Sequence, residues 1–158
     1  MQKKTVAESR TALSEVMMPV YANHYGSVHG GLIMKLADEA AFVAASKHSR
    51  KKVVVVSMDH IEFKHPVNVG DVLTLNAAIY HVGRTSMDVE VIIQAQKLKE
   101  GKTVDIGSAY MTMVALDQKG RPTKVPGLIL KTKEEIKKNR EIALKRQRRV
   151  ANFCQDNQ

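Results

Sequence analysis

One stretch of the sequence gathers residue types that could perform chemistry on a carbonyl group. A glycine pair, Gly30 and Gly31, opens a long apolar segment whose middle carries the carboxylate Asp38. The first backbone N–H groups of a helix have no partner inside it, and without Cβ atoms the glycines would let a substrate carbonyl approach those groups. Donors placed in this way form an oxyanion hole. The stretch is therefore interpreted as a candidate active site.

The carboxylate of Asp38 is the candidate reactive group. At 3.6 residues per turn, it shares a helix face with Met34, Ala41, Phe42 and Ala45. A carboxylate among apolar neighbours loses hydration unless a hydrogen-bond donor replaces the lost water, and this loss makes it a stronger base. Taken alone, Asp38 fits a structural role satisfied by backbone groups equally well, and a glycine pair alone is typical of a tight turn. Together they favour catalysis.

The apolar segment predicts the helix that must position these groups. Between Leu32 and Ala45 only Lys35, Asp38 and Glu39 are polar. This composition predicts a helix, continuing to His48, that is buried on nearly all sides and forms the hub of the core.

These residues also carry a family resemblance. The pattern N-x-x-G-x-x-H-G-G, followed by L-x-D-E in the helix, is present as Asn23, Gly26, His29, Gly30, Gly31, Leu36, Asp38 and Glu39. The pattern resembles the hotdog-fold acyl-CoA thioesterases, most closely the acyl-CoA hydrolase branch that includes brain acyl-CoA hydrolase and its single-domain bacterial relatives. The similarity extends through Val54–Val67, the Val82–Ser86 turn and the Gly120–Pro126 segment.

The resemblance implies an activity and a set of site residues. The activity is hydrolysis of acyl-CoA thioesters to free fatty acid and coenzyme A, within fatty acid metabolism, and it needs no cofactor because coenzyme A is part of the substrate. Asp38 would act as general base or as nucleophile, and Asn23 would hold the water or the thioester. The oxyanion and substrate residues would be His29, Gly30 and Gly31. The residues that contact coenzyme A would be Arg84, Thr85, Ser86 and Arg121.

The rest of the chain predicts a sheet. Leu13–Met18 is a plausible first strand, and Val53–Phe63 begins with four valines, which is typical of a strand buried on both faces. Two segments, 73–80 and 87–96, alternate apolar and polar residues as half-buried strands do, and Val104–Leu116 supplies the last strand. One long helix and about five antiparallel strands give an α+β domain whose sheet wraps the helix, in agreement with the hotdog fold.

The positive charge is concentrated at the C-terminal end. The chain has a formal charge of +9, and residues 131–150 contain nine Lys or Arg against three Glu, a net +6. Thr132 and Glu135 form a capping-box pattern, so a basic helix is expected, with a thin apolar stripe of Ile136, Ala143, Leu144 and Val150. We therefore divide the chain into a hotdog domain, 1–130, and a basic helical tail, 131–158. A solvated helix docked on the domain fits the tail at least as well as a functional patch.

Several classes of protein are disfavoured by what the sequence lacks. The histidines show no metal-ligand spacing, so no metal is expected. The basic tail has no interleaved aromatic residues, which argues against nucleic-acid binding. No apolar run approaches the ~20 residues of a membrane span, residues 1–10 read as a loose polar segment, and the single cysteine, Cys154, fits a reducing compartment. A cytoplasmic protein without a membrane anchor is expected.

The resemblance also implies an assembly, and two other functions were weighed against hydrolysis. Family members pair so that the Asn loop of one subunit meets the helix of the other, so a homo-oligomer is expected, a dimer or a hexamer built as a trimer of dimers. A hotdog enoyl-thioester hydratase or dehydratase would need a His paired with an acid at a spacing that His29 and Glu39 do not match well. A non-enzymatic acyl-CoA sensor would not need both Asn23 and Asp38.

Overall fold

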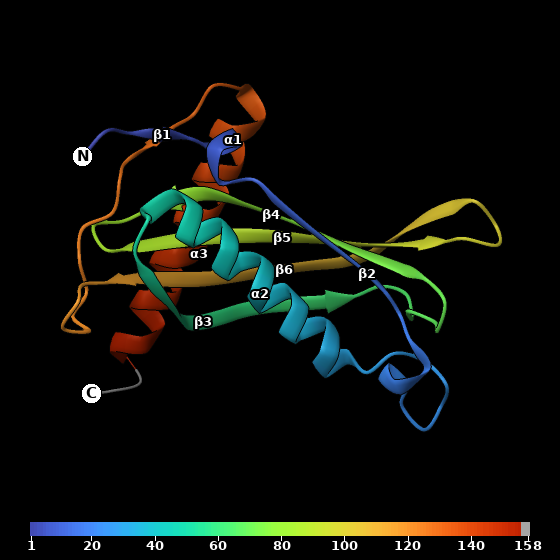
Figure 1. Ribbon diagram of the computed structural model, residues 1–158. Coiled ribbons are helices and arrows are strands. Elements are labelled where there is room, and N and C mark those ends of the chain that lie inside the picture. The colour runs from blue at the N-terminus through green and yellow to red at the C-terminus, as the bar shows by residue number, and fades with distance from the viewer. Residues whose placement is uncertain (156–158) are drawn as a thin grey trace.

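The protein folds as a curved antiparallel sheet around one long helix (Figure 1). The computed structural model describes residues 1–155, with side chains described through Arg148. In chain order the helices and strands are β1 (Lys4–Thr5), α1 (Val6–Ser9), β2 (Thr11–Val16), the 3₁₀ turn η1 (Pro19–Tyr21), α2 (Gly30–Ser49), β3 (Lys52–Phe63), β4 (Val72–Val82), β5 (Ser86–Lys97), β6 (Lys102–Leu116), β7 (Leu128–Ile129) and α3 (Lys133–Gln155).

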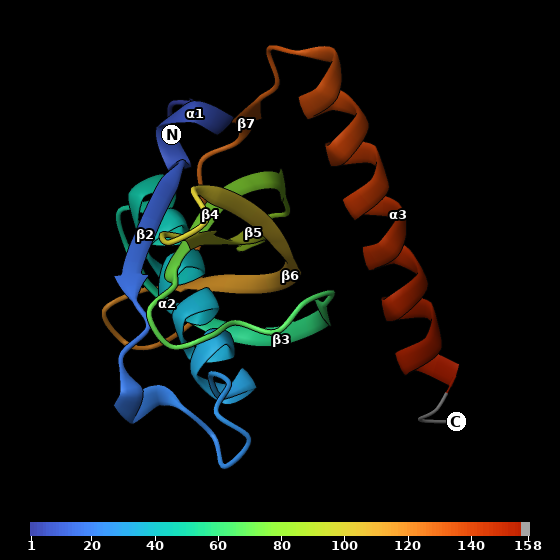
Figure 2. The ribbon, with the colours of Figure 1, turned by 90° about the vertical axis from the view of Figure 1, so that its right-hand side faces the viewer.

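The main sheet confirms the fold class expected from the sequence. Its five strands are antiparallel in the order β2-β4-β5-β6-β3, so β2 and β3 form its two edges. The short strands β1 and β7 pair in parallel beside it. In Figure 2, α2 lies on one side of the sheet and α3 on the other. The β4–β5 turn and the turn after β6 lie at the end of the sheet near the C-terminus of α2, whereas the Asn23 loop lies near the helix start (Figure 1).

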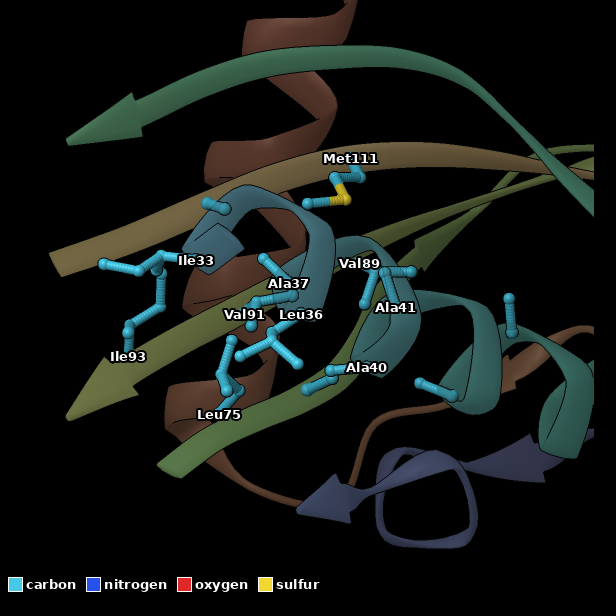
Figure 3. Packing of buried hydrophobic residues seen from close by; sticks show 14 of the residues in the cluster. Ile33, Leu36, Ala37, Ala40, Ala41, Leu75, Val89, Val91, Ile93 and Met111 are labelled. Carbon is cyan, nitrogen blue, oxygen red and sulfur yellow. The ribbon is translucent and has the colours of Figure 1, made fainter. Parts of the chain in front are cut away.

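The core forms between α2 and the concave face of the sheet. Small side chains on α2, at Ala37, Ala40, Ala41 and Ala44, are fully buried and let the helix approach the strands closely. Figure 3 shows Ile33 and Leu36 of the same helix among Leu75 of β4, Val91 and Ile93 of β5 and Met111 of β6.

The prediction that α2 is buried on nearly all sides is wrong for the single chain. Met34 and Phe42 are exposed by 41% and 47%, and Lys35 is exposed beside them. Because these residues follow one another at helical spacing, they form an exposed stripe along α2 in which Asp38 also lies.

The prediction that β3 is buried on both faces is also wrong for this chain. β3 is an edge strand, and Val55 and Val56 are exposed by 43% and 56%. The exposed side chains of Met34 and Phe42 on α2 and of Val55 and Val56 on β3 are called here the α2–β3 apolar surface.

Two further expectations for the chain ends need correction. Residues 1–10 are not loose throughout, because β1 and α1 form within them and Val6 and Ser9 are buried. The capping box of Thr132 and Glu135 is present: Glu135 N–H donates to Thr132 Oγ1, and Glu135 Oε2 accepts from Thr132 N–H. The apolar stripe of α3 was misplaced, however.

Ile142, which is 7% exposed, is the buried apolar residue of α3 among the side chains described through Arg148. Ile136 and Leu144, which the sequence assigned to the stripe, are exposed instead. Of the other two stripe residues, Ala143 is half-buried and the Val150 side chain lies outside the described residues.

No helix in residues 1–155 combines the length and apolar character needed to cross a membrane.

Candidate active site

A pocket of about 510 Å³ lies between α2 and the β3 edge strand. It is lined from α2 by Gly31, Met34, Lys35 and Asp38, and from β3 by Val55, Val56, Ser57 and Met58. The pairing of β3 with β6 shifts register between Val55 and Ser57, as at a β-bulge. Bulges re-aim side chains and recur beside active sites, which is consistent with the place of Ser57 on this wall.

Asp38 is the carboxylate of this pocket. Its Oδ1 atom is shielded from solvent and accepts no hydrogen bond from any residue that the structure describes. A buried carboxylate oxygen without a donor costs free energy, and such an atom in a native structure calls for an explanation. A substrate, a water molecule or a donor from a second subunit would supply the missing partner.

Two charged neighbours of Asp38 are engaged with each other. Lys35 Nζ donates to Glu39 Oε1 at 2.7 Å across one helical turn, and this bond raises the pKa of Lys35. Both side chains are largely exposed, so the pair contributes little to stability.

The start of α2 offers free N–H donors beside the pocket. Leu32 and Ile33 N–H both donate to the His29 carbonyl, whereas the N–H groups of Gly30 and Gly31 meet no acceptor in residues 1–155. His29 itself is the N-cap residue and lies exposed, with its N–H bonded to the Tyr21 carbonyl at 3.0 Å.

The two glycines face different surroundings. A Cβ atom at Gly31 would have no atom of the described part of the chain within 4 Å, and Gly31 shares the pocket with Asp38. A Cβ atom at Gly30 would lie 3.6 Å from the Phe63 ring, and Gly30 lines a separate hollow with Phe63 and Pro66. Gly31 is thus the glycine whose N–H and free space lie beside the carboxylate.

Asn23 lies outside this pocket. Its Oδ1 accepts from Tyr25 N–H at 2.9 Å, and its amide donates to Ser27 Oγ at 3.1 Å. The side chain thus stabilises the loop in which it lies. The structure does not bring Asn23 and Asp38 together within one chain.

The candidate coenzyme A residues gather at the other end of α2. Arg84 is exposed at the β4–β5 turn, and its carbonyl accepts from Val125 N–H at 3.0 Å. Arg121 is exposed in the turn after β6, where its guanidinium pairs with the Asp117 carboxylate at 3.1 Å. Thr85 is half-buried, and Ser86 is buried with its Oγ accepting from Arg146 at 2.7 Å.

The sequence analysis missed several residues around these sites. Ser57 and Met58 line the Asp38 pocket, but in the sequence they follow four valines and give no separate signal. Asp88 and Glu90 were expected on the solvent side of a half-buried strand, and both are buried, each 6% exposed, beneath α3. Their alternation with Val89 and Val91 looks the same whether a helix covers the polar face or not.

Comparison with known proteins identifies a family match and close relatives. A family model described as the thioesterase superfamily matches residues 25–102. Protein VdlD of Helicobacter pylori is 35% identical over 90% of this chain and 80% of its own. An uncharacterized acyl-CoA thioester hydrolase of Bacillus subtilis, YkhA, is 32% identical over 82% and 75%. The cytosolic acyl coenzyme A thioester hydrolase of rat is 33% identical over 89% of this chain, which spans only 37% of the rat protein.

Solved structures with the same fold extend the comparison. An apo-hexameric acyl-CoA thioesterase superimposes with a TM-score of 0.93 at 33% identity, covering 97% of this chain and 98% of that one. The acyl-CoA hydrolase of Staphylococcus aureus in complex with butyryl coenzyme A and coenzyme A gives 0.90 at 30%, covering 98% and 94%. Two variants of that enzyme, with one asparagine or one aspartate changed to alanine, give 0.92 and 0.90 at 29%.

Proposed function

Because this chain belongs to the thioesterase superfamily and hydrolyses acyl-CoA thioesters, we propose that Asp38 is its catalytic carboxylate and that Gly31 N–H stabilises the oxyanion. The unpartnered, buried Oδ1 of Asp38 beside an open pocket is the observation that carries the proposal. The asparagine and aspartate changed in the S. aureus variants are fifteen positions apart, as Asn23 and Asp38 are. No observation favours a hydratase or a sensor.

The pocket supplies the groups that thioester hydrolysis needs. In the first route, Asp38 takes a proton from a water molecule while the oxygen of that water attacks the thioester carbon. The carbonyl oxygen becomes negative and accepts a hydrogen bond from Gly31 N–H. Collapse of this intermediate breaks the C–S bond and releases coenzyme A as a thiolate, which takes up a proton. In the second route Asp38 attacks the carbon itself, the thiolate leaves, and water then hydrolyses the mixed anhydride. Both routes use the same carboxylate.

Coenzyme A is assigned to the end of the sheet where Arg84 and Arg121 lie. Its phosphates are anionic, and an arginine can pair with a phosphate through two parallel N–H bonds. The exposed Arg84, next to Thr85, is the main contact in this proposal, and Arg121 is the second. Ser86 is turned toward α3, so its contribution to binding is to hold the turn.

A second copy of the chain completes the site in this proposal. The α2–β3 apolar surface flanks the pocket on the β3 edge, where another subunit could extend the sheet and cover it. We infer a homodimer in which the partner brings its own Asn23 loop to the Asp38 pocket, and a hexamer as the larger assembly, in line with the hexameric thioesterase of the same fold. We place the reaction in the cytoplasm, within fatty acid metabolism, as the name of the rat relative suggests.

Replacing Asp38 by asparagine tests the catalytic role. The amide has nearly the same shape but cannot take a proton, so we expect thiol release from acyl-CoA to fall by roughly 10²–10⁴-fold. The thermal unfolding midpoint and the binding of coenzyme A should stay close to those of the unchanged protein.

The adjacent Glu39→Gln is the matched control, because it makes the same chemical change at an exposed position on the next helix face. It should retain activity. Turnover of Asp38→Asn within a few fold of the unchanged protein would remove Asp38 from the mechanism.

A further inference from the structure

Through Arg148, the last residue whose side chain is described, helix α3 contacts the outer face of the sheet largely through charged groups. Asp88 and Glu90 of β5 are both buried there, and each receives a cation from α3: Arg146 pairs with Asp88 and Lys138 with Glu90. Ile142 is the buried apolar residue that α3 adds to this contact. The docking of α3 therefore depends on its cations meeting two carboxylates.

Asp88 is satisfied on every side. Its Oδ2 accepts from Arg146 at 2.8 Å and from the His81 ring at 2.6 Å, and its Oδ1 accepts from Thr112 at 2.6 Å. Burial alone would raise the pKa of Asp88, but these three bonds hold it below its usual value. The carboxylate stays charged and fixes the Arg146 guanidinium in place.

Arg146 also reaches the turn that carries Arg84. Its second terminal nitrogen donates to Ser86 Oγ at 2.7 Å. Gly83 lies next to this hydrogen bond, because a Cβ atom at residue 83 would lie 2.8 Å from Ser86 Oγ and 3.6 Å from the Arg146 guanidinium. One side chain of α3 thus ties the β4–β5 turn to the buried carboxylate of Asp88.

The opposite side of the turn is held by the backbone. The Arg84 and Thr85 carbonyls accept from Val125 and Ala115 N–H, each at 3.0 Å, and Gly83 N–H closes the turn on the Ser86 carbonyl at 2.9 Å. With these bonds on one side and Arg146 on the other, the backbone that presents the Arg84 side chain has little freedom. Such preorganisation lowers the entropy lost when a ligand binds.

We propose that Arg146 is a positioning residue for coenzyme A: it fixes the Gly83–Ser86 turn so that Arg84 meets the phosphates of the substrate. The inference rests on the proposed function, in which Arg84 contacts coenzyme A. It gives α3 a role in substrate binding that is carried by one defined contact and not by the overall positive charge of the helix.

The test compares two substrates on two charge-matched variants. Arg146→Met removes the contact, and Arg140→Met removes the same charge from an exposed position on the same helix. Each variant is assayed with an acyl-CoA and with the acyl-pantetheine thioester, which lacks the nucleotide and its phosphates. Arg146→Met should raise KM for acyl-CoA about tenfold, as loss of one charged hydrogen bond would, with kcat and the acyl-pantetheine KM unchanged. Arg140→Met should leave both KM values within about twofold.

Two results would overturn the inference. An equal rise of KM on both substrates would show that Arg146 only supports the fold, and an unchanged KM for acyl-CoA would show that the turn needs no help from α3. If Arg146→Met fails to fold because the buried Asp88 loses its cationic partner, the double variant Asp88→Asn/Arg146→Met removes both charges and must show the same split between substrates.

A further variant separates this inference from the proposed function. If Arg84→Gln leaves KM for acyl-CoA unchanged, the assignment of Arg84 to coenzyme A fails. Exchange of the Gly83 amide hydrogen in Arg146→Met then still reports whether Arg146 fixes the turn, and faster exchange is expected. If Arg84→Gln raises KM and Arg146→Met does not, the positioning role alone is wrong.

Discussion

At the scale of single residues, the free space at Gly31 is as informative as the carboxylate of Asp38. No atom of the described residues lies within 4 Å of where a Cβ atom of residue 31 would stand, so packing among them does not require glycine there. A requirement for glycine would come from what approaches Gly31 N–H from the pocket. Gly30 differs, because its Cβ position already lies against Phe63.

Gly31→Ala therefore separates stability from activity. Alanine favours a helix over glycine by up to ~1 kcal/mol, so the free energy of unfolding should stay the same or rise slightly. The added methyl group narrows the approach to the N–H donor, and we expect kcat to fall by roughly 10–10³-fold. Urea unfolding and thiol release on the same preparation measure both quantities. Full activity would mean that no substrate atom comes close to residue 31.

His48 is a residue whose titration should be visible in stability. It is fully buried, its Nε2 lies 2.9 Å from the Pro126 carbonyl, and its Nδ1 has no partner among the described residues. Burial lowers the pKa of His48. The unfolded chain then binds a proton near the ordinary histidine pKa of about 6.5, while the folded chain stays neutral to lower pH.

We expect the free energy of unfolding to fall as pH drops below about 6.5, with a slope from this one group of at most ~1.4 kcal/mol per pH unit. His48→Gln keeps an amide donor for Pro126 but cannot titrate, so it should flatten this slope. Urea titrations at several pH values give the slope, and the exposed His65→Gln serves as the matched substitution. If the unfolding free energy of His48→Gln depends on pH as steeply as that of the unchanged protein, a group other than His48 causes the pH dependence.

At the scale of secondary-structure elements, the paired strands β3 and β6 approach each other unusually closely at one point. Gly107 of β6 has a φ of +153°, and a Cβ atom there would lie only 1.8 Å from the Glu62 carbonyl oxygen of β3. The two strands can pair through this point only because residue 107 has no side chain.

Gly107→Ala should lower the free energy of unfolding by roughly 3 kcal/mol or more, because the strands must separate to admit the methyl group. Gly101→Ala is the control: Gly101 has a φ of +64° but open space around it, so it should cost only about 1 kcal/mol. Denaturant unfolding of both variants measures the difference. An equal loss of unfolding free energy in both variants would mean that β3 and β6 can move apart at Gly107 at little cost.

The elements also show how far the sequence could predict the structure. The succession of strands along the chain and the long helix follow from apolar periodicity and turn residues, and the motif predicts that Gly31 and Asp38 lie together, as they do in the pocket. Periodicity records which residues avoid water but not what covers them. The valines of β3 predict a buried strand, which agrees with the proposed dimer in which a second subunit covers this edge. Asp88 was expected to be exposed because α3, which covers it, is distant in sequence. Long-range partners of this kind leave no local pattern.

At the scale of the whole molecule, Asn23 lies outside the Asp38 pocket of its own chain, and the proposed dimer would join the two residues across subunits. If each site combines the Asn23 loop of one chain with Asp38 of another, a dimer of Asn23→Ala and Asp38→Asn subunits has one site with both defects and one with neither.

Mixing the two variants should then restore activity. Random re-association of equal amounts makes about half of the dimers mixed, each with one intact site of two, so about a quarter of the unchanged activity should return. Co-refolding followed by thiol release per subunit is the measurement, with each variant alone as the blank. Mixed dimers that stay inactive would place both residues of a site on one chain.

The pairing of Asp88 with Arg146 also constrains how this sequence can change over generations. Losing Arg146 leaves the buried Asp88 with only its His81 and Thr112 bonds, and losing Asp88 leaves Arg146 with only its bond to Ser86, so either single loss lowers the stability of the domain. Replacing both by well-packed neutral side chains can cost little. Two positions that lie 58 residues apart are thus expected to be kept together or replaced together. A descendant chain that had lost only one of them would be at a disadvantage before it could acquire the second change.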